Sequence, residues 1–399
     1  MANILFLTHW TDGDVLPFFK IGRLLKTYGH EITIFTHCVF EDTAKKYGFH
    51  FVPIDSQAEY LEMQKDFPVL ADAVNDMESV VAFQNKYHGV ERLLREYECI
   101  KPYCEKEDTL LIFRHRSSMA ALLLADKLSL PAISVFLAPN YLSHLDFHEE
   151  IMGDAMKVEI NKAREMIGLP QIDSWTKWMC SATGIIGLWP KWFASEEEGW
   201  PSKLKVMGFP TIEPSQDEPD QLIEKYLERH SKCVIVSGGT SKMVSADFYQ
   251  TAIKACQFAQ VGCIAVIPFE ELKPKEEFDG VLMVAKLDLR ATLAKVDGII
   301  HHGGMGTLSE ALFFKVPQII MAHLVDRPEN AQRLRENDLC LSYPPKRWQP
   351  ERVAEGIQKI LSNVYRKEYE HRIDHLNCFA GEELNDYILE ILKGGTDKI

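Results

Sequence analysis

The sequence predicts an α/β protein made of two doubly wound, Rossmann-like domains with parallel sheets. Short apolar runs alternate with stretches of helical periodicity, as in "NILFLT", "VLPFFKIGRLLKTYG" and "HEITIFT". The same alternation restarts after a segment rich in proline and acidic residues. The length of 399 residues also suits two domains of roughly 100–200 residues each.

The first domain begins with a buried strand over residues 3–8, a loop over 9–14 and a helix that ends at Gly29. The next strand follows at once, so the order is strand, helix, strand within about 35 residues, which is typical of a parallel βαβ unit. The pattern repeats with a strand at 109–113, the helix "MAALLLADKL" and the strand "PAISVFL". We therefore expect one parallel sheet over residues 1–210.

A stiff, solvated linker is expected at residues 211–221, where "PTIEPSQDEPDQ" concentrates prolines and acids. The second domain is expected at 222–399, with the strands "KCVIVS", "CIAVIPF", "VLMVAKL", "GIIHH" and "PQIIMAH". Helices are predicted between most of them, at 246–260, 289–296, 307–315 and 328–338. The last helix, in "EELNDYILEILK", could pack back on the first domain.

Composition narrows the class of protein. The formal net charge is −14, which disfavours nucleic-acid binding and attachment to anionic lipid through a global basic field. Nine cysteines without any C-x-x-C pair suggest a reduced, cytoplasmic protein. The N-terminus reads as a core strand, and no apolar run reaches the ~18 residues of a membrane span.

A glycine-rich turn joins a predicted strand to a helix in "GIIHHGGMGTLSEAL". Gly303, Gly304 and Gly306 leave the backbone open to a ligand. The helix that follows directs free N–H groups and about half a positive charge at the turn, and a histidine adds a donor. These features suit a phosphate. Tight packing alone is the other explanation for such glycines.

Two parts of this turn have further interpretations. A metal site would need His301 and His302 to reach one ion, but adjacent strand residues point to opposite faces, so we expect no metal. "TLSE", Thr307–Glu310, also fits a capping box in which Glu310 closes the helix start. A structural role and a ligand-binding role for Glu310 both stay open.

The longer stretch "HHGGMGTLSEALFFKVPQIIMAHLVDRPENAQRL" resembles the donor-binding signature of the UDP-glycosyltransferase-like superfamily. The family pattern is roughly H-x-G-x-x-S/T-x-x-E, then G-V-P and D-Q-x-x-N. "DGDVLPFFKIGRLLKTYGHEITIFT", "LWPKWFASEEEGWPSKLKVMGFP" and "VIVSGGTS" resemble segments of its bacterial, natural-product and sterol-type branch. The resemblance is weakest over 56–106 and 141–179. The matching signature positions are His302, Gly303, Gly304, Gly306, Thr307, Glu310, Val316, Pro317, Asp326 and Asn330.

This resemblance implies the GT-B fold, with two Rossmann-like domains facing across a cleft, and inverting hexose transfer from a nucleotide sugar. A UDP-sugar would be the co-substrate, and neither a metal nor another cofactor would be needed. Donors around the glycine turn would stabilise charge on the leaving diphosphate. Glu310 would bind the ribose diol and Asp326 the sugar hydroxyls. The implied donor-binding residues are Gly239, Thr240, His302, Gly304, Gly306, Thr307, Glu310, Asp326 and Arg327.

The resemblance also places a catalytic base in "GDVLP", where many relatives have the histidine of G-H-x-x-P. The matching residue is Asp14, which lies just before a helix with Pro17 in its first turn. Asp14 is therefore also a good N-cap, and both roles stay open. Asp12 and His9 are rival bases. We take Asp14 and His302 as the candidate catalytic residues.

The expected partner of that base is missing. Relatives often carry an aspartate after the strand at 109–113, where this chain has "FRHRSS". If Arg114, His115 or Arg116 faced Asp14, it would stabilise the negative charge of Asp14 and weaken that residue as a base.

Other candidates concern the donor and the acceptor. Arg327 replaces the glutamine of the family's D-Q pair, and it could meet a phosphate or a sugar carboxylate or pair with Glu329. Aromatic residues in and after "APNYLSHLDFHEE" suit a flat, apolar acceptor, although core packing explains them equally well. The candidate acceptor-binding residues are His9, Trp10, His115 and Asn140.

Three functions fit these observations. The first is a glycosyltransferase acting on a hydroxylated, apolar small molecule such as a polyketide or macrolide, a phenolic compound or a terpenoid. The second is an epimerase-type enzyme that binds a nucleotide sugar. The third is a non-catalytic auxiliary glycosyltransferase subunit. A dinucleotide-dependent dehydrogenase is disfavoured because no G-x-G-x-x-G follows "NILFLT".

Overall fold

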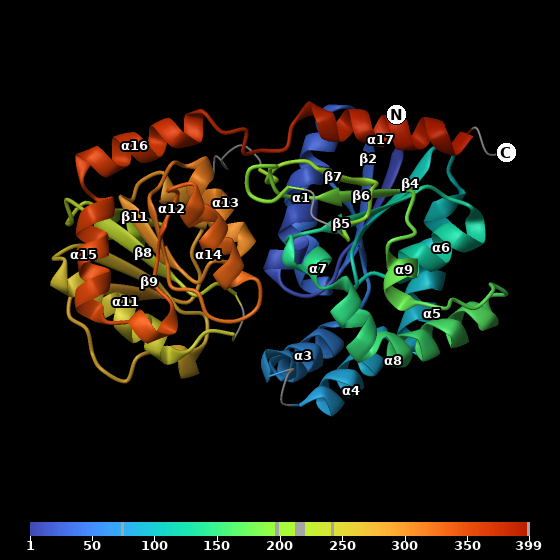
Figure 1. Cartoon of the computed structure of the whole chain (residues 1–399), viewed down its shortest axis with the longest axis horizontal. Helices are drawn as coiled ribbons and strands as arrows, with labels where there is room; N and C mark the ends of the chain where they lie inside the picture. The colour runs from blue at the N-terminus through green and yellow to red at the C-terminus, as the bar shows by residue number, and fades with distance from the viewer. Residues whose placement is uncertain (73–75, 196–198, 212–219, 241–242, 397–399) are drawn as a thin grey trace. The chain divides into compact units, whose positions relative to one another are not determined.

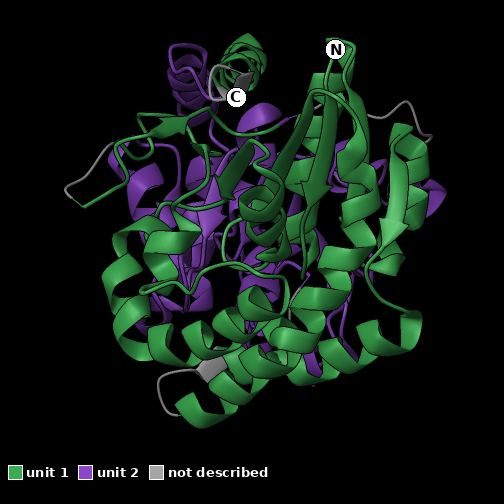
Figure 2. Cartoon of the chain, turned by 90° about the vertical axis from the view of Figure 1, so that its right-hand side faces the viewer, with its two compact units in different colours: residues 1–210, 379–399 green, residues 211–378 purple. Residues whose placement is uncertain are grey.

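A computed structural model describes residues 1–72, 76–195, 199–211, 220–240 and 243–396. These residues form two compact units (Figures 1 and 2). Unit 1 comprises Met1–Pro210 and Phe379–Ile399, and unit 2 comprises Thr211–Cys378. The domain expected at 222–399 thus ends at Cys378 in the structure, because the last helix joins unit 1. Most of the expected linker at 211–221 lies outside the described residues.

The described part of unit 1 contains a seven-stranded sheet with the order β3-β2-β1-β4-β5-β6-β7. All of its strand pairs are parallel. The chain first adds strands on one side of β1 and then returns to add β4 on the other, so the order reverses between β1 and β4. The strands are β1 (Asn3–Leu7), β2 (Glu31–Thr36), β3 (His50–Pro53), β4 (Thr109–Arg114), β5 (Ala132–Phe136), β6 (Gly184–Gly187) and β7 (Leu204–Val206).

Helices cover both faces of this sheet, and the sequence of β1 shows why. Leu5 and Leu7 belong to one buried cluster, whereas Ile4 and Phe6 belong to another on the opposite face. A strand that is buried on both faces needs a continuous apolar run, and parallel sheets commonly have such strands. The helices are α1 (Asp12–Thr27), α2 (Glu41–Tyr47), α3 (Gln57–Asp66), α4 (Met77–His88), α5 (Val90–Ile100), α6 (Ala120–Leu128), α7 (Asn140–Ser143), α8 (Leu145–Met166), α9 (Trp175–Met179) and α17 (Glu382–Thr396).

The last helix, α17, packs on unit 1, although the residues that precede it in sequence belong to unit 2 (Figure 1). Phe379 forms an isolated parallel bridge with Phe209. Leu384 and Ile388 are fully buried in the cluster that also contains Ile4. His30 Nε2 and Asn385 Oδ1 lie 2.9 Å apart. The apolar face of α17 thus completes the core of unit 1, as the sequence allowed.

The described part of unit 2 contains a six-stranded sheet with the order β10-β9-β8-β11-β12-β13. Its strand pairs are also parallel. The order reverses between β8 and β11, as it does between β1 and β4 in unit 1. The strands are β8 (Cys233–Ser237), β9 (Gly262–Val266), β10 (Val281–Val284), β11 (Gly298–His301), β12 (Gln318–Ile320) and β13 (Leu341–Ser342).

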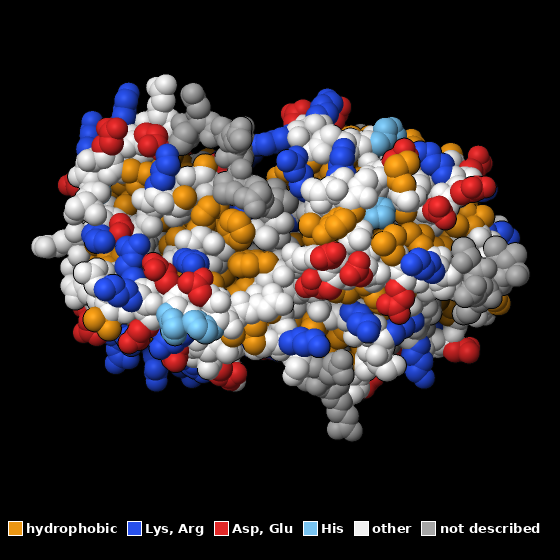
Figure 3. Space-filling model, turned by 90° about the horizontal axis from the view of Figure 1, so that it is seen from above, with side chains coloured by type: hydrophobic (Ala, Val, Ile, Leu, Met, Phe, Trp, Pro, Cys, Tyr) orange, Lys and Arg blue, Asp and Glu red, His pale blue; other side chains and the backbone are white. Residues whose placement is uncertain are grey.

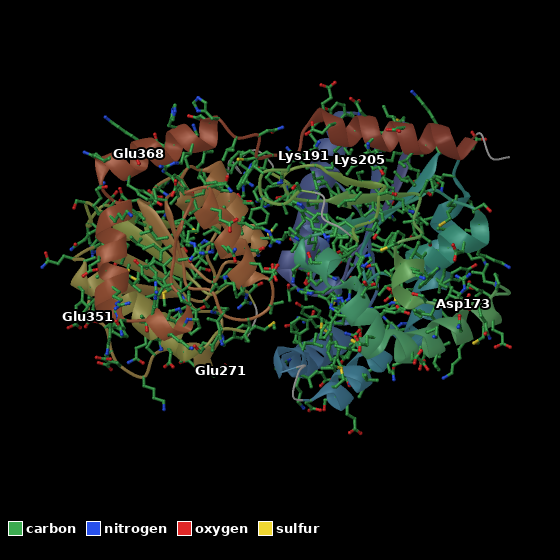
Figure 4. The ribbon with its side chains drawn as sticks, viewed as in Figure 1. Asp173, Lys191, Lys205, Glu271, Glu351 and Glu368 are labelled. Atoms are coloured by element: carbon green, nitrogen blue, oxygen red, sulfur yellow. The ribbon has the colours of Figure 1, made fainter. Side chains whose placement is uncertain are left out.

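Helices also flank the sheet of unit 2. Glu351 on α15 and Glu368 on α16 are exposed and point away from the sheet (Figure 4). On the face that carries α16, acidic and basic side chains are interspersed (Figure 3). No described helix has the length and hydropathy required to cross a membrane. The helices are α10 (Gln221–Leu227), α11 (Ala246–Phe258), α12 (Leu289–Leu293), α13 (Met305–Phe313), α14 (Arg327–Glu336), α15 (Pro350–Ile360) and α16 (Asn363–Asp374).

Candidate active site

The predicted site residues gather at the point of each sheet where the strand order reverses. In doubly wound sheets, ligands bind outside the carboxyl ends of the strands at this point. In unit 2, β8 and β11 end there in the two glycine turns. In unit 1, β1 runs there into the loop that carries His9, and β4 ends there at Arg114. Each unit therefore has its own candidate subsite.

In unit 2, His302 lies between the two glycine turns. A Cβ atom on Gly239 would come within 2.6 Å of His302 Cε1, and one on Gly304 within 2.4 Å of His302 Nε2. Both positions therefore need glycine for the imidazole to fit. Burial, with Arg327 and His301 nearby, holds the pKa of His302 well below its ordinary value. The ring is neutral, and Nδ1 has no hydrogen-bond partner among the described residues.

The neighbouring His301 points to the opposite face, as expected for adjacent strand residues. Its Nε2 lies 2.9 Å from Gln318 Oε1, and its Nδ1 accepts a hydrogen bond from Gly303 N at 3.1 Å. Burial lowers the pKa of His301 to about 4. His301 is thus a buried structural residue, and the pair does not converge on one point.

Helix α13 begins at Met305, with Gly304 as its N-cap. Thr307 consequently lies in the first turn, and the capping box predicted for Thr307 and Glu310 is wrong. A Cβ atom on Gly306 would meet no atom within 4 Å. The start of the helix therefore offers backbone N–H groups beside open space, which is the arrangement that an anion needs.

Glu310 is buried and forms an ion pair with Arg290 of α12. Arg290 Nη1 donates to Glu310 Oε1 at 2.8 Å, and only 14% and 8% of the two side chains are exposed. The Arg290 guanidinium also lies over the rings of Phe313 and Phe314. Glu310 is thereby held in a fixed position near the first turn of α13.

The loop before α14 is tied to the glycine turn. Asn330 Nδ2 donates to Gly303 O at 3.1 Å and to Asp326 Oδ2 at 2.7 Å. Arg327 is buried, and its Nη1 donates to Met243 O at 2.6 Å, in the loop after β8. Glu329, the alternative partner considered for Arg327, pairs with Arg333. The structure thus brings Asp326, Arg327 and the glycine turns together, with Thr240 exposed at the end of the β8 turn.

In unit 1, Asp14 occupies the third position of α1, because the helix begins at Asp12 after the N-cap Thr11. Asp14 Oδ2 accepts hydrogen bonds from Thr11 N at 3.1 Å and Thr11 Oγ1 at 2.8 Å. Asp14 Oδ1 accepts from Arg114 Nε at 2.9 Å and Arg114 Nη2 at 2.7 Å. Asp14 therefore closes the helix start as the third helical residue of a capping box and not as the expected N-cap. Its other oxygen faces Arg114.

A polar cavity of about 200 Å³ opens beside the carboxyl ends of β1, β2 and β3. Two candidate acceptor-binding residues, His9 and Trp10, line it. His9 Nε2 lies 3.3 Å from Glu96 Oε1, and His9 Nδ1 lies 2.9 Å from Ser118 Oγ. The lining residues are His9, Trp10, His37, Asp55, Glu59, Glu62, Met63, Lys86, Tyr87, His88, Glu91, Arg92, Arg95 and Glu96.

The other two acceptor candidates do not line this cavity. His115 Nδ1 lies 3.0 Å from Ser134 Oγ, and its ring stacks on Phe136 at 3.8 Å. Burial holds the pKa of His115 well below its ordinary value. Asn140 is buried at the start of α7, and its Oδ1 has no hydrogen-bond partner among the described residues.

Several cavity residues were not identified from the sequence. His37 and Asp55 directly follow β2 and β3, so their places at carboxyl ends of parallel strands were a usable signal. His88 and Glu96 lie on helices in the region of weakest resemblance, and no sequence pattern marks them. Burial alone would raise the pKa of Glu96, but the adjacent His9 and Arg92 hold it below its ordinary value.

This chain is similar to a described protein family and to proteins of other organisms. Residues 275–377 match the family described as "Erythromycin biosynthesis protein CIII-like, C-terminal domain". A sterol 3-beta-glucosyltransferase of Pichia angusta is 24% identical over 395 residues, which cover 90% of this chain and 31% of that protein. A sterol 3-beta-glucosyltransferase of Candida albicans is 24% identical over 374 residues, which cover 84% of this chain and 24% of that protein. The chain thus spans a third or less of the length of these relatives.

Solved structures share the fold over almost the whole chain. The glycotransferase of kitacinnamycin has a TM-score of 0.71 and 17% identity, and covers 98% of this chain and 99% of that one. Glycosyltransferase VinC, solved in complex with dTDP, has a TM-score of 0.65 and 17% identity. The match covers 98% of this chain and 100% of VinC. The two doubly wound units are therefore those of the GT-B fold.

Proposed function

We propose that this chain is an inverting, metal-independent glycosyltransferase of the UDP-glycosyltransferase-like superfamily, which its similarity to the erythromycin CIII-like family, the sterol glucosyltransferases and the GT-B structures supports. It would transfer a hexose from a nucleotide sugar, in the first instance a UDP-sugar, to a hydroxyl group of a small-molecule acceptor. The donor would bind to unit 2 and the acceptor to unit 1.

One observation carries this proposal: His302 lies between two glycine turns, where only glycine leaves room for it. Its Nδ1 has no partner among the described side chains and main-chain groups. Gly306 borders open space at the start of α13. An imidazole and free N–H groups at a helix start suit a diphosphate, whose charge grows as the sugar leaves.

The neighbouring residues support a nucleotide sugar in particular. Glu310 is fixed by Arg290, so its carboxylate is oriented to accept from a vicinal diol such as that of ribose. Asp326 is oriented by Asn330 and would accept from sugar hydroxyls. Thr307 and Thr240 add hydroxyl donors beside the two turns. Arg327 would act through the loop after β8, since its guanidinium holds Met243 O.

The catalytic base would come from unit 1, and Asp14 is the first candidate. A general base must reach the acceptor hydroxyl and accept its proton. Asp14 already accepts hydrogen bonds from Thr11 and Arg114 on its two oxygens. It would act as a base only if a substrate displaced one of these donors. His9, which contacts Glu96, is the alternative base.

The Asp14–Arg114 ion pair also favours a second candidate function. A non-catalytic auxiliary subunit would keep the GT-B fold and the donor site but would need no base. The two functions predict the same donor binding and differ in turnover.

A donor and acceptor screen tests the proposal. The full chain is incubated with UDP-, dTDP- and GDP-hexoses and a panel of hydroxylated acceptors, and the acceptor mass is read by mass spectrometry. We expect a hexose-sized gain that is lost in His302→Ala and kept in the surface control His371→Ala. Donor binding without any mass gain or donor consumption would instead support the auxiliary subunit. Absence of nucleotide-sugar binding would refute both.

A further inference from the structure

The cavity beside β1, β2 and β3 is a built site rather than a packing defect. Trp10, at the end of β1, has a φ of 90°, which is unfavourable for a bulky residue. The strained main chain is held by a hydrogen bond from Trp10 N to His37 Nε2 at 2.8 Å. Strain of this kind collects at functional sites.

Asp55 holds His37 in turn. Since His37 Nε2 accepts from Trp10, its Nδ1 carries the proton and donates to Asp55 Oδ2 at 2.5 Å. Asp55 Oδ1 accepts from Cys38 N at 2.9 Å. The chain from Asp55 through His37 thus fixes the main chain at Trp10, a residue of the cavity lining whose ring stacks on Phe83.

His88 is a polar residue of the cavity lining. Only 5% of His88 is exposed, and burial lowers its pKa to about 3, so the ring is neutral. Its ring lies edge-on to the rings of Trp10 and His9 and interacts with the charges of Glu96 and Arg92, and it makes no hydrogen bond with another described residue. A neutral imidazole has one donor and one acceptor. A hydroxyl group, which also both donates and accepts, complements it.

Charge limits the ligand further. The lining includes five carboxylates (Asp55, Glu59, Glu62, Glu91 and Glu96) and three cations (Lys86, Arg92 and Arg95). Five negative and three positive charges leave a formal charge of −2 with the histidines counted as neutral. Such a lining disfavours a carboxylate or phosphate ligand and admits a neutral or cationic one.

Size argues for one ring. An apolar cavity of ~150 Å³ holds benzene, so the cavity of about 200 Å³ suits a single six-membered ring with polar substituents. Its mouth is solvated, because Glu62 and Glu91 are exposed. A fused four-ring skeleton is larger, and its apolar surface would not match a lining of paired charges and histidines.

We propose that this cavity binds a hydroxyl-rich six-membered ring, neutral or cationic, such as a sugar or an amino sugar. The inference rests on the proposed function in one respect: the cavity then serves as the acceptor subsite, and the acceptor is a carbohydrate or a glycoside. Trp10 provides the apolar wall for the ring, and His88 binds a ring hydroxyl. This differs from the flat, apolar acceptor expected from the sequence.

The test measures binding to the full chain by ligand-observed NMR titration. The probes are methyl β-glucoside, glucosamine, glucuronate and the flat apolar alcohol 2-naphthol. We expect glucosamine and methyl glucoside to bind at least tenfold more tightly than glucuronate. His88→Phe should weaken both by about tenfold, because it removes the hydrogen bond to the hydroxyl. The matched control, His50→Phe, changes an exposed histidine of unit 1 outside the cavity and should have no effect.

A second variant tests the role of charge without touching the core. The double substitution Glu62→Lys and Glu91→Lys at the exposed mouth changes the formal charge from −2 to +2. It should reverse the preference between glucosamine and glucuronate. Tighter binding of 2-naphthol than of both sugars would overturn the proposal. So would sugar binding that is unchanged in His88→Phe, or absent altogether.

Failure of this proposal is distinguishable from failure of the proposed function. Binding of UDP, dTDP and GDP is measured on the same samples and depends on unit 2. Sugar binding that His88→Phe removes, in a chain that binds none of UDP, dTDP and GDP, would refute the transferase and support the cavity. UDP binding without sugar binding would refute the cavity alone.

Discussion

Arg114 and Asp14 form an ion pair between residues that are 100 positions apart in the sequence. Arg114 ends β4, and Asp14 lies in the first turn of α1. Only 11% and 18% of the two side chains are exposed. Members of the family that this sequence resembles often have a histidine at the position of Asp14 and an aspartate after the strand that corresponds to β4. Here a carboxylate and a guanidinium take their place, which changes what this part of unit 1 can do.

This pair should contribute strongly to stability. Asp14→Ala removes the capping interaction with Thr11 and leaves the buried charge of Arg114 unopposed. We expect the free energy of unfolding to fall by about 2–4 kcal/mol. Urea denaturation of the full chain measures it. Asp42→Ala, an exposed acid in the first turn of α2, is the control and should change it by less than about 0.5 kcal/mol.

A second substitution at Asp14 distinguishes its role as a helix cap from a role as the catalytic base. Asp14→Asn retains the size of the side chain and can still accept from Thr11. If Asp14 is the base, kcat should fall by at least about a hundredfold while donor binding is unchanged. Turnover that survives this substitution would assign Asp14 to the helix cap and make His9 the base to test next.

The glycines of the donor turn should differ in their response to alanine. At Gly306, which lies in α13, a Cβ atom meets no neighbour, so Gly306→Ala should keep or raise the thermal midpoint and weaken UDP binding by about tenfold by filling the space beside the helix start. At Gly304 a Cβ atom would collide with His302, so Gly304→Ala should lower both stability and binding. Calorimetry on both variants measures this. Equal UDP affinity in Gly306→Ala and the unaltered chain would remove that position from the donor site.

Arg290 and Glu310 should be energetically coupled. Both side chains are largely buried and directly bonded, so removal of either leaves the other charge poorly solvated. A double-mutant cycle with Arg290→Met and Glu310→Gln should give a coupling energy of about 1–3 kcal/mol. Arg333 and Glu329, a more exposed pair on α14, are the control and should couple by no more than about 0.5 kcal/mol. A coupling of that small size at Arg290 would contradict the buried ion pair.

Buried histidines should make the protein less stable in mild acid. Burial lowers the pKa of His301 to about 4, against about 6.5 in an unfolded chain. Below pH 6.5 the unfolded state therefore binds a proton that the folded state does not, so stability is full above pH 6.5 and falls as the pH drops toward 4. The slope should be about 1.4 kcal/mol per pH unit for this residue once the pH is well below 6.5.

Denaturation at pH 7.0, 6.0 and 5.0 measures this slope before carboxylates with ordinary pKa values titrate. His301→Gln should reduce the slope, because it removes the titrating group and can still bond to Gln318. His371→Gln, which alters an exposed histidine, is the matched control. An identical slope in His301→Gln would show that His301 does not titrate differently in the folded state.

Much of the fold could be predicted because its signals are local. The run "NILFLT" predicted β1, and "GIIHH" predicted β11, since strands buried on both faces need continuous apolar residues. Helix starts were predicted less well. Asp14 was expected as the N-cap of α1 and Thr307 as the N-cap of α13, but the observed N-caps, Thr11 and Gly304, each lie three residues earlier.

The candidate donor site could be proposed from the sequence, because its members follow β8, β11 and the loop before α14 in the order of the family's signature. The cavity of unit 1 was not, although it contains His9 and Trp10 from the candidate set. Its other groups come from the loops after β2 and β3 and from α3, α4 and α5, and the sequence patterns of these helices resemble those of ordinary solvated helices.

The sequence by itself determined the alternation of strands and helices, the two parallel sheets and the glycine turn before α13. These features depend on side-chain periodicity and backbone freedom over a few residues. Only the tertiary structure decided that Asp14 meets Arg114 and that His88 lines a cavity beside Trp10. The reason is physical. Such contacts depend on which strands become neighbours in the sheet, and that order results from the packing of the whole core rather than from any short segment.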